Sequence, residues 1–333
     1  MKAMLCKEFG PPESLVLSEL PSPSAKPGQV VVQVKACGVN FPDVLIIENK
    51  YQFKPPLPFA PGAEVAGVVK EIGEGVTGFK VGDRVIAPTG WNGMQEETLA
   101  FAAKLIPMPP EMDFVTGASL MLTYGTSHYA LKDRARLKPA ESLVVLGAAG
   151  GVGLAAVEIG KVMGARVIAG ASSQEKVDLA KAHGADEGFV YPTGKLERDQ
   201  QKALSETIKK LAGGEGADVI YDPVGGDYAE PALRAMNWDG RYLVIGFATG
   251  EIPKVPLNLT LLKGCSIVGV FWGSFTARDP GRNQEHMAEL VRWASEGKIK
   301  PHIGATFPLD RAGEAIRMLA DRKAQGKVVV TMD

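Results

Sequence analysis

The first third of the chain alternates short apolar runs with glycine and proline and shows no helical repeat. Apolar and β-branched residues gather at 29–36, 62–72, 83–87 and 98–102. Runs of this length, cut by Gly and Pro, are typical of β-strands joined by turns. Residues 1–122 therefore predict a partly closed β domain.

From residue 142 the pattern changes to a repeated alternation of strand and helix. Six apolar runs that predict strands lie at 142–146, 166–170, 188–191, 218–221, 241–245 and 266–270. Helical patterns lie between them, at 151–163, 174–182, 200–211 and 228–236. Alternating strands and helices form parallel sheets, and six strands complete a doubly wound sheet. We therefore predict an α/β protein whose second domain holds a six-stranded parallel sheet.

The last sixty residues predict two amphipathic helices and one strand. The helices lie at 284–295 and 311–321, and the strand at 327–332. This tail is too short to form a domain, so we expect it to pack on the N-terminal β domain. The predicted domains are 1–122, completed by about 275–333, and 123–274.

Composition excludes several classes of function. Lys and Arg number 37 against 38 Asp and Glu among 333 residues, a net charge of −1 that lacks the basic footprint of a nucleic-acid binder. No run approaches the ~18 apolar residues of a membrane span. The N-terminus has no long apolar core, so we expect a cytoplasmic protein. Three cysteines without CxxC spacing and four histidines argue against a disulfide framework and a metal site.

A glycine-rich turn joins the strand at 142–146 to the helix at 151–163. It reads Gly-Ala-Ala-Gly-Gly-Val-Gly over 147–153. This context predicts a dinucleotide site, because a pyrophosphate binds the free N–H groups and the positive end of a helix. A side chain at Gly150 or Gly151 would hold the backbone away from that group, and Ala148 replaces the usual first glycine. The predicted cofactor-binding residues here are Ala149, Gly150, Gly151, Val152 and Gly153.

The residues after the second predicted strand favour NADPH over NADH. Proteins that bind NAD carry an acid there, whereas this chain has Ser172 and Ser173, followed by Lys176. Two hydroxyls and an ammonium can bind a 2′-phosphate through charge-assisted hydrogen bonds. Alternatively, Ser172 and Glu175 form only a helix capping box. Tyr191, at the end of the third strand, either flanks the adenosine or is an ordinary half-buried strand residue.

Four segments of the chain resemble the zinc-free quinone oxidoreductases of the medium-chain dehydrogenase/reductase superfamily, relatives of zeta-crystallin. They are Gly-Val-Asn-Phe-Pro-Asp at 38–43, Pro-Gly-Ala-Glu-Val-Ala-Gly at 61–67, Val-Gly-Asp-Arg-Val at 81–85 and the glycine turn at 147–153. The similarity extends over essentially the whole chain. The resemblance implies a GroES-like catalytic domain, a Rossmann domain, an active site in the cleft between them and a homodimer.

The resemblance also argues against a catalytic zinc. Zinc-dependent relatives have cysteine at the position of Asn40, histidine at that of Ala63 and cysteine near Leu122. Without a metal to stabilise an alkoxide, alcohol oxidation is hard. Hydride delivery to a quinone or an α,β-unsaturated carbonyl needs only hydrogen-bond donors for the developing oxyanion.

The resemblance implies that Asn40, Asp43 and Tyr51 are catalytic, and that Asn40 also contacts the cofactor. The Asn40 carboxamide and the Tyr51 phenol could donate to the oxyanion, and Tyr51 or water could supply a proton. We expect Asp43 to orient the others. Leu45 replaces a family tyrosine, which removes one candidate donor. Alternatively, Asn40 caps a turn and Tyr51 packs in the β domain. We interpret Glu64 as a structural anchor.

Further site residues lie near the predicted carboxyl ends of strands, where doubly wound sheets bind ligands. Thr126 matches a family threonine near the nicotinamide, and Phe247 follows the fifth strand. Phe271 and Trp272 follow the sixth, where they contact the cofactor and acceptor or belong to a dimer surface. Trp91 either covers the pocket or is an exposed loop aromatic. The predicted substrate pocket comprises Tyr51, Trp91 and Trp272.

These features together predict an NADPH-dependent, metal-free oxidoreductase that transfers a hydride from nicotinamide to a quinone or an enone. One alternative is an enoyl- or acrylyl-thioester reductase. It would need a basic groove for coenzyme A, with Lys54, Arg278 and Arg282 as candidates. The other alternative is a low-turnover NADPH-binding structural or sensor protein.

Overall fold

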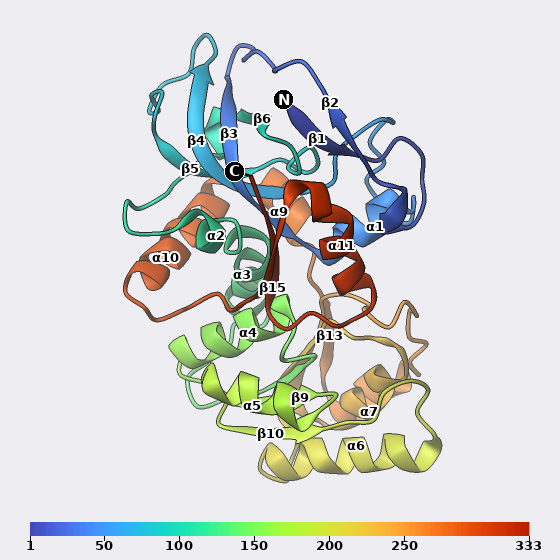
Figure 1. Cartoon of the computed structure of the whole chain (residues 1–333). Helices are drawn as coiled ribbons and strands as arrows, with labels where there is room; N and C mark the ends of the chain where they lie inside the picture. Colours follow the sequence, from blue (N-terminus) through green and yellow to red (C-terminus); the bar gives the residue numbers. More distant parts are fainter. Residues whose placement is uncertain (333) are drawn as a thin grey trace. The chain divides into compact units, whose positions relative to one another are not determined.

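The computed structural model describes residues 1–332, which form two compact units (Figure 1). Unit 1 comprises Met1–Leu122, Pro280–Gly297 and the chain from Pro301 onward, and unit 2 comprises Thr123–Asp279 and Lys298–Lys300. Within residues 1–332, no helix is long and apolar enough to cross a membrane.

Unit 1 is built on a seven-stranded sheet. In sheet order its strands are β14 (Ile303–Pro308), β15 (Lys327–Thr331), β3 (Gln29–Val39), β4 (Glu64–Ile72), β5 (Arg84–Pro88) and β7 (Ile106–Pro107), and β6 (Glu97–Phe101) pairs with β3. All neighbours are antiparallel except β14 and β15. A separate antiparallel pair joins β1 (Lys2–Leu5) to β2 (Val16–Glu19). The long β3 therefore lies between β15, from the end of the chain, and β4, from its N-terminal part.

Short helices surround this sheet. They are α1 (Phe41–Ile47), α2 (Phe114–Gly117), α10 (Pro280–Ser295) and α11 (Ala312–Ala320), with 3₁₀ turns at Pro12–Ser14, Ala102–Lys104 and Leu309–Arg311. The N-terminal third, which shows no helical repeat in its sequence, nevertheless contains helix α1. This helix has only seven residues, too few to show a repeat, and it begins directly after β3. Its Val44, Ile46 and Ile47 enter the unit 1 core.

Unit 2 contains the predicted six-stranded parallel sheet. In sheet order its strands are β10 (Glu187–Val190), β9 (Arg166–Ala171), β8 (Ser142–Leu146), β11 (Ala217–Asp222), β12 (Met236–Val244) and β13 (Ser266–Gly269), and every neighbouring pair is parallel. Numbered from β8, the order is 3-2-1-4-5-6, that of a doubly wound dinucleotide-binding fold. The prediction of an α/β fold with this sheet is confirmed.

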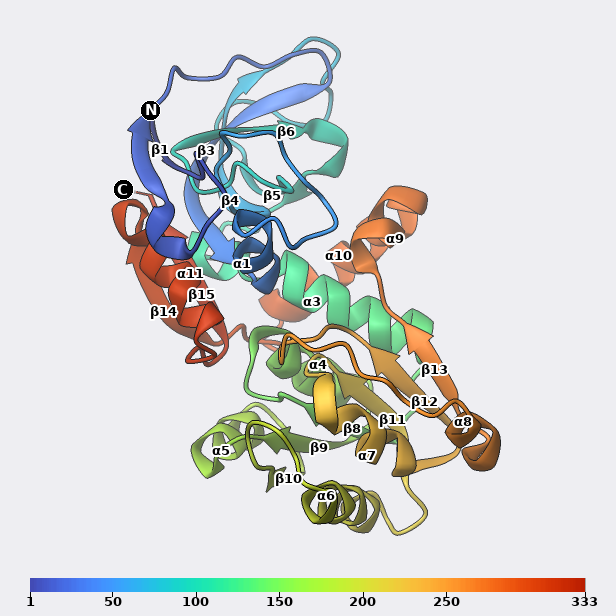
Figure 2. The ribbon, with the colours of Figure 1, turned by 90° about the vertical axis from the view of Figure 1, so that its right-hand side faces the viewer.

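Helices cover both faces of the unit 2 sheet (Figure 2). They are α3 (Met121–His128), which continues as a π-helical segment over Tyr129–Arg134, α4 (Gly151–Val162), α5 (Gln174–Ala182), α6 (Arg198–Leu211), α7 (Ala229–Arg234) and α8 (Asn258–Lys263), with a 3₁₀ turn at Gly226–Tyr228. A further helix, α9 (Trp272–Arg278), follows β13 and packs on α3. Helix α4 packs so closely on β8 and β9 that a Cβ at Gly160 would lie 2.6 Å from Leu143. Side chains of α6 and α7 pack on the other face, in a core with Val144 and Ile220.

Candidate functional site

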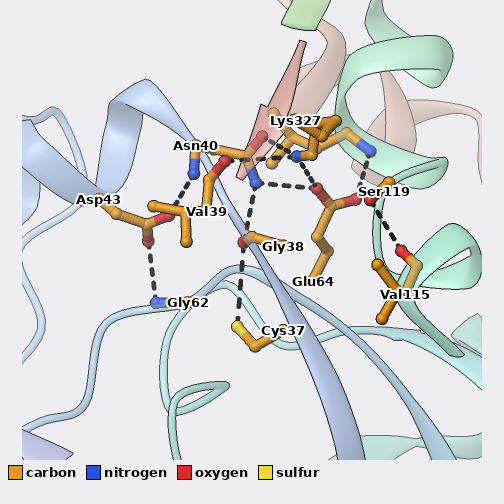
Figure 3. Close-up of polar contacts among 11 residues, drawn as sticks. Cys37, Gly38, Val39, Asn40, Asp43, Gly62, Glu64, Val115, Ser119 and Lys327 are labelled. Atoms are coloured by element: carbon orange, nitrogen blue, oxygen red, sulfur yellow. Dashed lines mark hydrogen bonds and ion pairs between the residues drawn. The ribbon is translucent and has the colours of Figure 1, made fainter. Parts of the chain in front are cut away.

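Asp43 fixes the start of α1 in unit 1 (Figure 3). One carboxylate oxygen accepts the backbone N–H of Asn40 at 2.7 Å, and the other accepts that of Gly62 at 2.8 Å. Burial raises the pKa of Asp43 to about 6, against the effect of these hydrogen bonds. Both oxygens are engaged by the backbone, so the geometry suits the orienting role predicted for this residue.

The Asn40 side chain lies in a buried polar cluster with Glu64 and Lys327. Its Nδ2 donates to Glu64 Oε1 at 2.8 Å and to the Gly38 carbonyl at 3.2 Å, and Lys327 Nζ donates to its Oδ1 at 2.8 Å. Both amide hydrogens are therefore used inside unit 1. This arrangement does not support the predicted donation from Asn40 to an oxyanion.

Lys327 was not among the predicted site residues. Its position directly before the apolar run that starts at Val328 was the only hint of burial in the sequence. That hint is weak, because a lysine at the end of a strand ordinarily points to solvent. In the structure its side chain is 3% exposed and its ammonium lies 2.7 Å from Glu64 Oε1. Glu64 also accepts the backbone N–H of Leu122 at 2.7 Å, which agrees with its interpretation as an anchor.

Tyr51 lies at the edge of the unit 1 core, four residues after α1. Its ring meets Phe53 edge-on, with centroids 5.8 Å apart, and within residues 1–332 its hydroxyl has no hydrogen-bonding partner. Burial, with a smaller effect from the charge of Asp43, raises the pKa of Tyr51. The phenol therefore stays protonated at neutral pH and can donate a hydrogen bond to a ligand.

Trp91, predicted for the substrate pocket, lies in a surface loop of unit 1. The loop is tied to a neighbouring segment, since the Asn92 N–H donates to the Ala60 carbonyl at 2.6 Å. The Trp91 side chain is 37% exposed. This position suits either an aromatic surface for a ligand or an ordinary loop residue.

The predicted glycine turn in unit 2 leads from β8 into α4. Gly147 has φ +61°, a conformation that favours glycine, so the tight turn falls one residue before Ala148. A Cβ at Gly153 would lie 2.2 Å from the Gly147 carbonyl oxygen, whereas a Cβ at Gly150 would lie 3.4 Å from the same atom. The fold itself thus requires Gly147 and Gly153. Gly150, the N-cap of α4, has room for a Cβ.

Tyr191 holds this turn from the side. Its hydroxyl accepts the N–H of Gly147 at 3.1 Å, and its buried ring lies beside Tyr228, with centroids 5.0 Å apart. The residue follows β10 directly. Tyr191 is therefore a fixed neighbour of the glycine turn and more deeply buried than the half-buried residue that we considered.

The Ser172, Ser173 and Lys176 side chains lie together at the end of β9. Lys176 Nζ donates to Ser172 Oγ at 3.1 Å, and Ser173 Oγ accepts the backbone N–H of Lys176 at 3.3 Å. The N-cap of α5 is Ser173, so the alternative capping box between Ser172 and Glu175 was wrong by one residue. Ser172 and the Lys176 ammonium remain available as a pair that fits a phosphate group.

Four other predicted residues lie in unit 2 around the ends of β12 and β13 or on α3. Phe247 follows β12 and lies against Gly225, and Phe271, 46% exposed, follows β13. Trp272 begins α9 and packs on Gly125 of α3, where a Cβ would come within 2.8 Å of the indole. Thr126 is the next residue of α3. All but Thr126 stand near carboxyl ends of strands, the edge where such sheets bind ligands.

Family models match both units of the chain. A model described as the alcohol dehydrogenase GroES-like domain matches residues 26–110, and one described as zinc-binding dehydrogenase matches residues 151–296. A quinone oxidoreductase-like protein 2 homolog of Nematostella vectensis is 39% identical over 332 residues, 99% of this chain and 88% of the relative. The human quinone oxidoreductase is 34% identical over 335 residues, 100% of this chain and 98% of the relative.

The chain belongs to the quinone oxidoreductase family of the medium-chain dehydrogenase/reductase superfamily.

Solved structures of this family match the same fold. A mycobacterial protein complexed with NADPH superimposes with a TM-score of 0.92 at 30% identity, over 99% of this chain and 100% of the other. The quinone oxidoreductase of Escherichia coli, also complexed with NADPH, gives a TM-score of 0.89 at 28% identity over the same shares. The family resemblance read from the sequence is confirmed.

This member of the quinone oxidoreductase family carries other residues at the positions where zinc-dependent relatives have their zinc ligands. Ala63 and Leu122 have no ligating side chain, and the Asn40 carboxamide is engaged by Lys327 and Glu64. Across residues 1–332, no group of three or more His, Cys, Asp or Glu side chains is placed to hold a metal ion.

Proposed function

We propose that this protein is an NADPH-dependent, metal-free reductase of quinones or α,β-unsaturated carbonyls. The observation that carries the proposal is the Lys176 ammonium bonded to Ser172 Oγ beside the end of β9, where proteins that bind NAD carry an acid. The names of the relatives and the NADPH in two matching structures support the same reading.

The residues of unit 2 fit NADPH. The first N–H groups of α4 have no partner within the helix, Gly150 presents no side chain, and the helix dipole favours an anion there. Ser172 and Lys176 offer a hydroxyl and an ammonium to the 2′-phosphate. When bound, the nicotinamide supplies a hydride from its C4 atom.

The chain's own contribution to the reduction lies in hydrogen bonding. Tyr51 keeps its proton at neutral pH, and its hydroxyl can donate to the acceptor oxygen as negative charge develops there. Asp43 holds the Asn40 segment through two backbone hydrogen bonds, one to each carboxylate oxygen, and its side chain is buried, which suits a positioning role. Asn40, Ala63 and Leu122 offer no metal ligand set, so neutral donors carry the stabilisation of the oxyanion.

The proposal is tested by following NADPH oxidation by chelator-treated protein. The panel contains quinones, enones and an enoyl thioester, with NADH measured in parallel. We expect turnover with a quinone or an enone and a clear preference for NADPH. Preferred reduction of the thioester would favour that alternative, and tight NADPH binding without turnover on any acceptor would favour a binding protein.

We further propose that two copies of the chain associate through β13 and α8. Among residues 1–332, strand β13 pairs with β12 alone, and Leu257, Leu261 and Leu262 beside or on α8 are 75%, 79% and 69% exposed. An unpaired strand edge with an apolar rim can pair with its copy across a two-fold axis. Light scattering should give twice 35.3 kDa for the wild type and 35.3 kDa for Leu261→Glu. A monomeric wild type would contradict the proposal.

A further inference from the structure

The Lys327 ammonium is completely enclosed in unit 1 (Figure 3). It donates to Glu64 Oε1 at 2.7 Å, to Asn40 Oδ1 at 2.8 Å and to the Val39 carbonyl at 3.4 Å. A lysine ammonium has three hydrogens and no acceptor site, so these contacts use it fully. Lys327 therefore cannot reach a ligand itself, and any influence on one must pass through its partners.

The partners of Asn40 fix the orientation of its carboxamide. Its Nδ2 faces the Glu64 carboxylate and the Gly38 carbonyl, which only accept, and its Oδ1 faces the Lys327 ammonium, which only donates. The reverse orientation would set donor against donor and acceptor against acceptor. Asn40 has no hydrogen left to give. Its remaining capacity is one lone pair on Oδ1, which accepts.

Stability alone does not account for a buried pair of charges here. Taking both ions from water costs much of what their attraction returns, and apolar side chains of similar volume are often as stable. The surroundings are also tight, since a Cβ at Gly38 would lie 2.7 Å from Glu64 Oε1 and 2.1 Å from the Ala118 carbonyl oxygen. Within these tightly packed surroundings, the ion pair of Lys327 and Glu64 holds the Asn40 side chain in one orientation.

We propose that Lys327 is a positioning residue for the reduction. Together with Glu64 it locks the Asn40 carboxamide so that the side chain presents only an acceptor. The ligand group that suits Asn40 is consequently a donor, such as a ribose hydroxyl or the carboxamide N–H of a nicotinamide, and not an oxyanion. This inference rests on the proposed function, because the group to be positioned belongs to the reacting complex.

The test separates positioning from stability. Lys327→Met leaves the Glu64 charge buried without its partner, so it is expected to destabilise the protein for that reason alone. The double variant Lys327→Met/Glu64→Gln removes both charges and is expected to recover most of the lost melting temperature. The Asn40 carboxamide is then free to turn. Val330→Ala, a buried change on the same strand whose side chain enters the apolar core on the face opposite to Lys327, controls for ordinary packing loss.

Hydride transfer is measured in single turnovers at saturating NADPH, with the primary deuterium isotope effect from NADPH labelled at C4. We expect the double variant to transfer hydride about 10- to 100-fold more slowly, with a raised isotope effect on kcat, since small displacements of reacting groups cost rates of this order. Val330→Ala should lower the melting temperature without changing the rate per folded molecule. A rate in the double variant within threefold of the wild type would overturn the inference.

Failure of the proposed function is recognised separately, because the wild type would then show no turnover with any acceptor.

The positioning of Asn40 has a readout that does not depend on activity. In the wild type its side-chain amide hydrogens, assigned with Asn40→Ala, should resist exchange with solvent. They should exchange faster in the double variant. Equal protection of these amide hydrogens from exchange in both proteins would refute the fixed orientation of Asn40, whatever the activity of the variants.

Discussion

Gly150 and Gly153 lie three residues apart in one turn, yet their substitution by alanine should affect different properties. A Cβ at Gly153 would lie 2.2 Å from the Gly147 carbonyl oxygen and 2.9 Å from Ala148 Cα, both backbone atoms that cannot turn away. The start of α4 would have to move off the end of β8. Overpacking of this kind costs about 1–3 kcal/mol of unfolding free energy. At about 2–4 °C per kcal/mol for a unit of this size, melting should fall by several degrees.

Gly150→Ala meets a different environment. Its nearest atom, the Gly147 carbonyl oxygen, would lie 3.4 Å away, and its φ of −79° is open to alanine. Loss of a favoured N-cap residue and the lower entropy of the unfolded chain oppose each other, so stability should change by less than about 1 kcal/mol. If the pyrophosphate binds this turn, the new methyl group weakens a hydrogen bond to a charged group. Such a bond is worth about 1.5–3 kcal/mol, so NADPH binding should fall about 10- to 100-fold.

Calorimetry measures the melting temperature of both variants, and titration with NADPH measures their affinity for the cofactor. We expect Gly153→Ala to lose melting temperature and Gly150→Ala to lose NADPH affinity. Unchanged melting of Gly153→Ala would refute the packing argument. Unchanged NADPH affinity of Gly150→Ala would refute the placing of the phosphates at this turn.

Three further outcomes follow from the site. Lys176→Ala should lower kcat/KM for NADPH about 10- to 100-fold and leave that for NADH nearly unchanged, because only the 2′-phosphate loses a charged partner; equal losses for both cofactors would count against the assignment. Tyr51→Phe should reduce kcat about 100-fold with little change in NADPH affinity, as removal of an oxyanion donor does, and unimpaired turnover would show that water or another group donates. Burial raises the pKa of Asp43 to about 6, above its ordinary 3.8. The folded state therefore binds more protons than the unfolded state between these values, and the contribution of Asp43 to stability falls by up to about 3 kcal/mol as the pH rises through that window. Urea denaturation from pH 4 to 7 should show this decline in the wild type and not in Asp43→Asn, and identical slopes would contradict it.

The sheet of unit 2 was predictable because its signals are local and repeated. Each strand is an apolar run closed by glycine or a polar turn, and helices α4, α5 and α6, with 12, 9 and 14 residues, are long enough to show a period. Helix α1 shows the limit, since seven residues with Pro42 near the start carry no period. The shift of the α5 N-cap from Ser172 to Ser173 is of the same kind, because adjacent serines suit that position equally.

The polar cluster of unit 1 was only half predictable. The Lys176–Ser172 contact in unit 2 joins residues only four apart in the chain, whereas Lys327 and Asn40 are 287 residues apart and meet only because β15 pairs with β3. A single sequence contains no trace of that pairing partner. Whether the Asn40 carboxamide can donate to a ligand depends on its hydrogen-bonding partners, and only the folded chain brings these partners together. The cytoplasmic location likewise remains a prediction from the sequence.

The central claim is a direct, metal-free transfer of hydride from NADPH to carbon. It is tested most directly with chelator-treated protein, an enone acceptor and NADPH carrying deuterium on one or the other face of C4. The account predicts that one of the two labelled cofactors delivers a single deuterium to the β-carbon of the product, and that the other delivers none. A product without deuterium from either cofactor, or activity that appears only when a metal ion is restored, would contradict it.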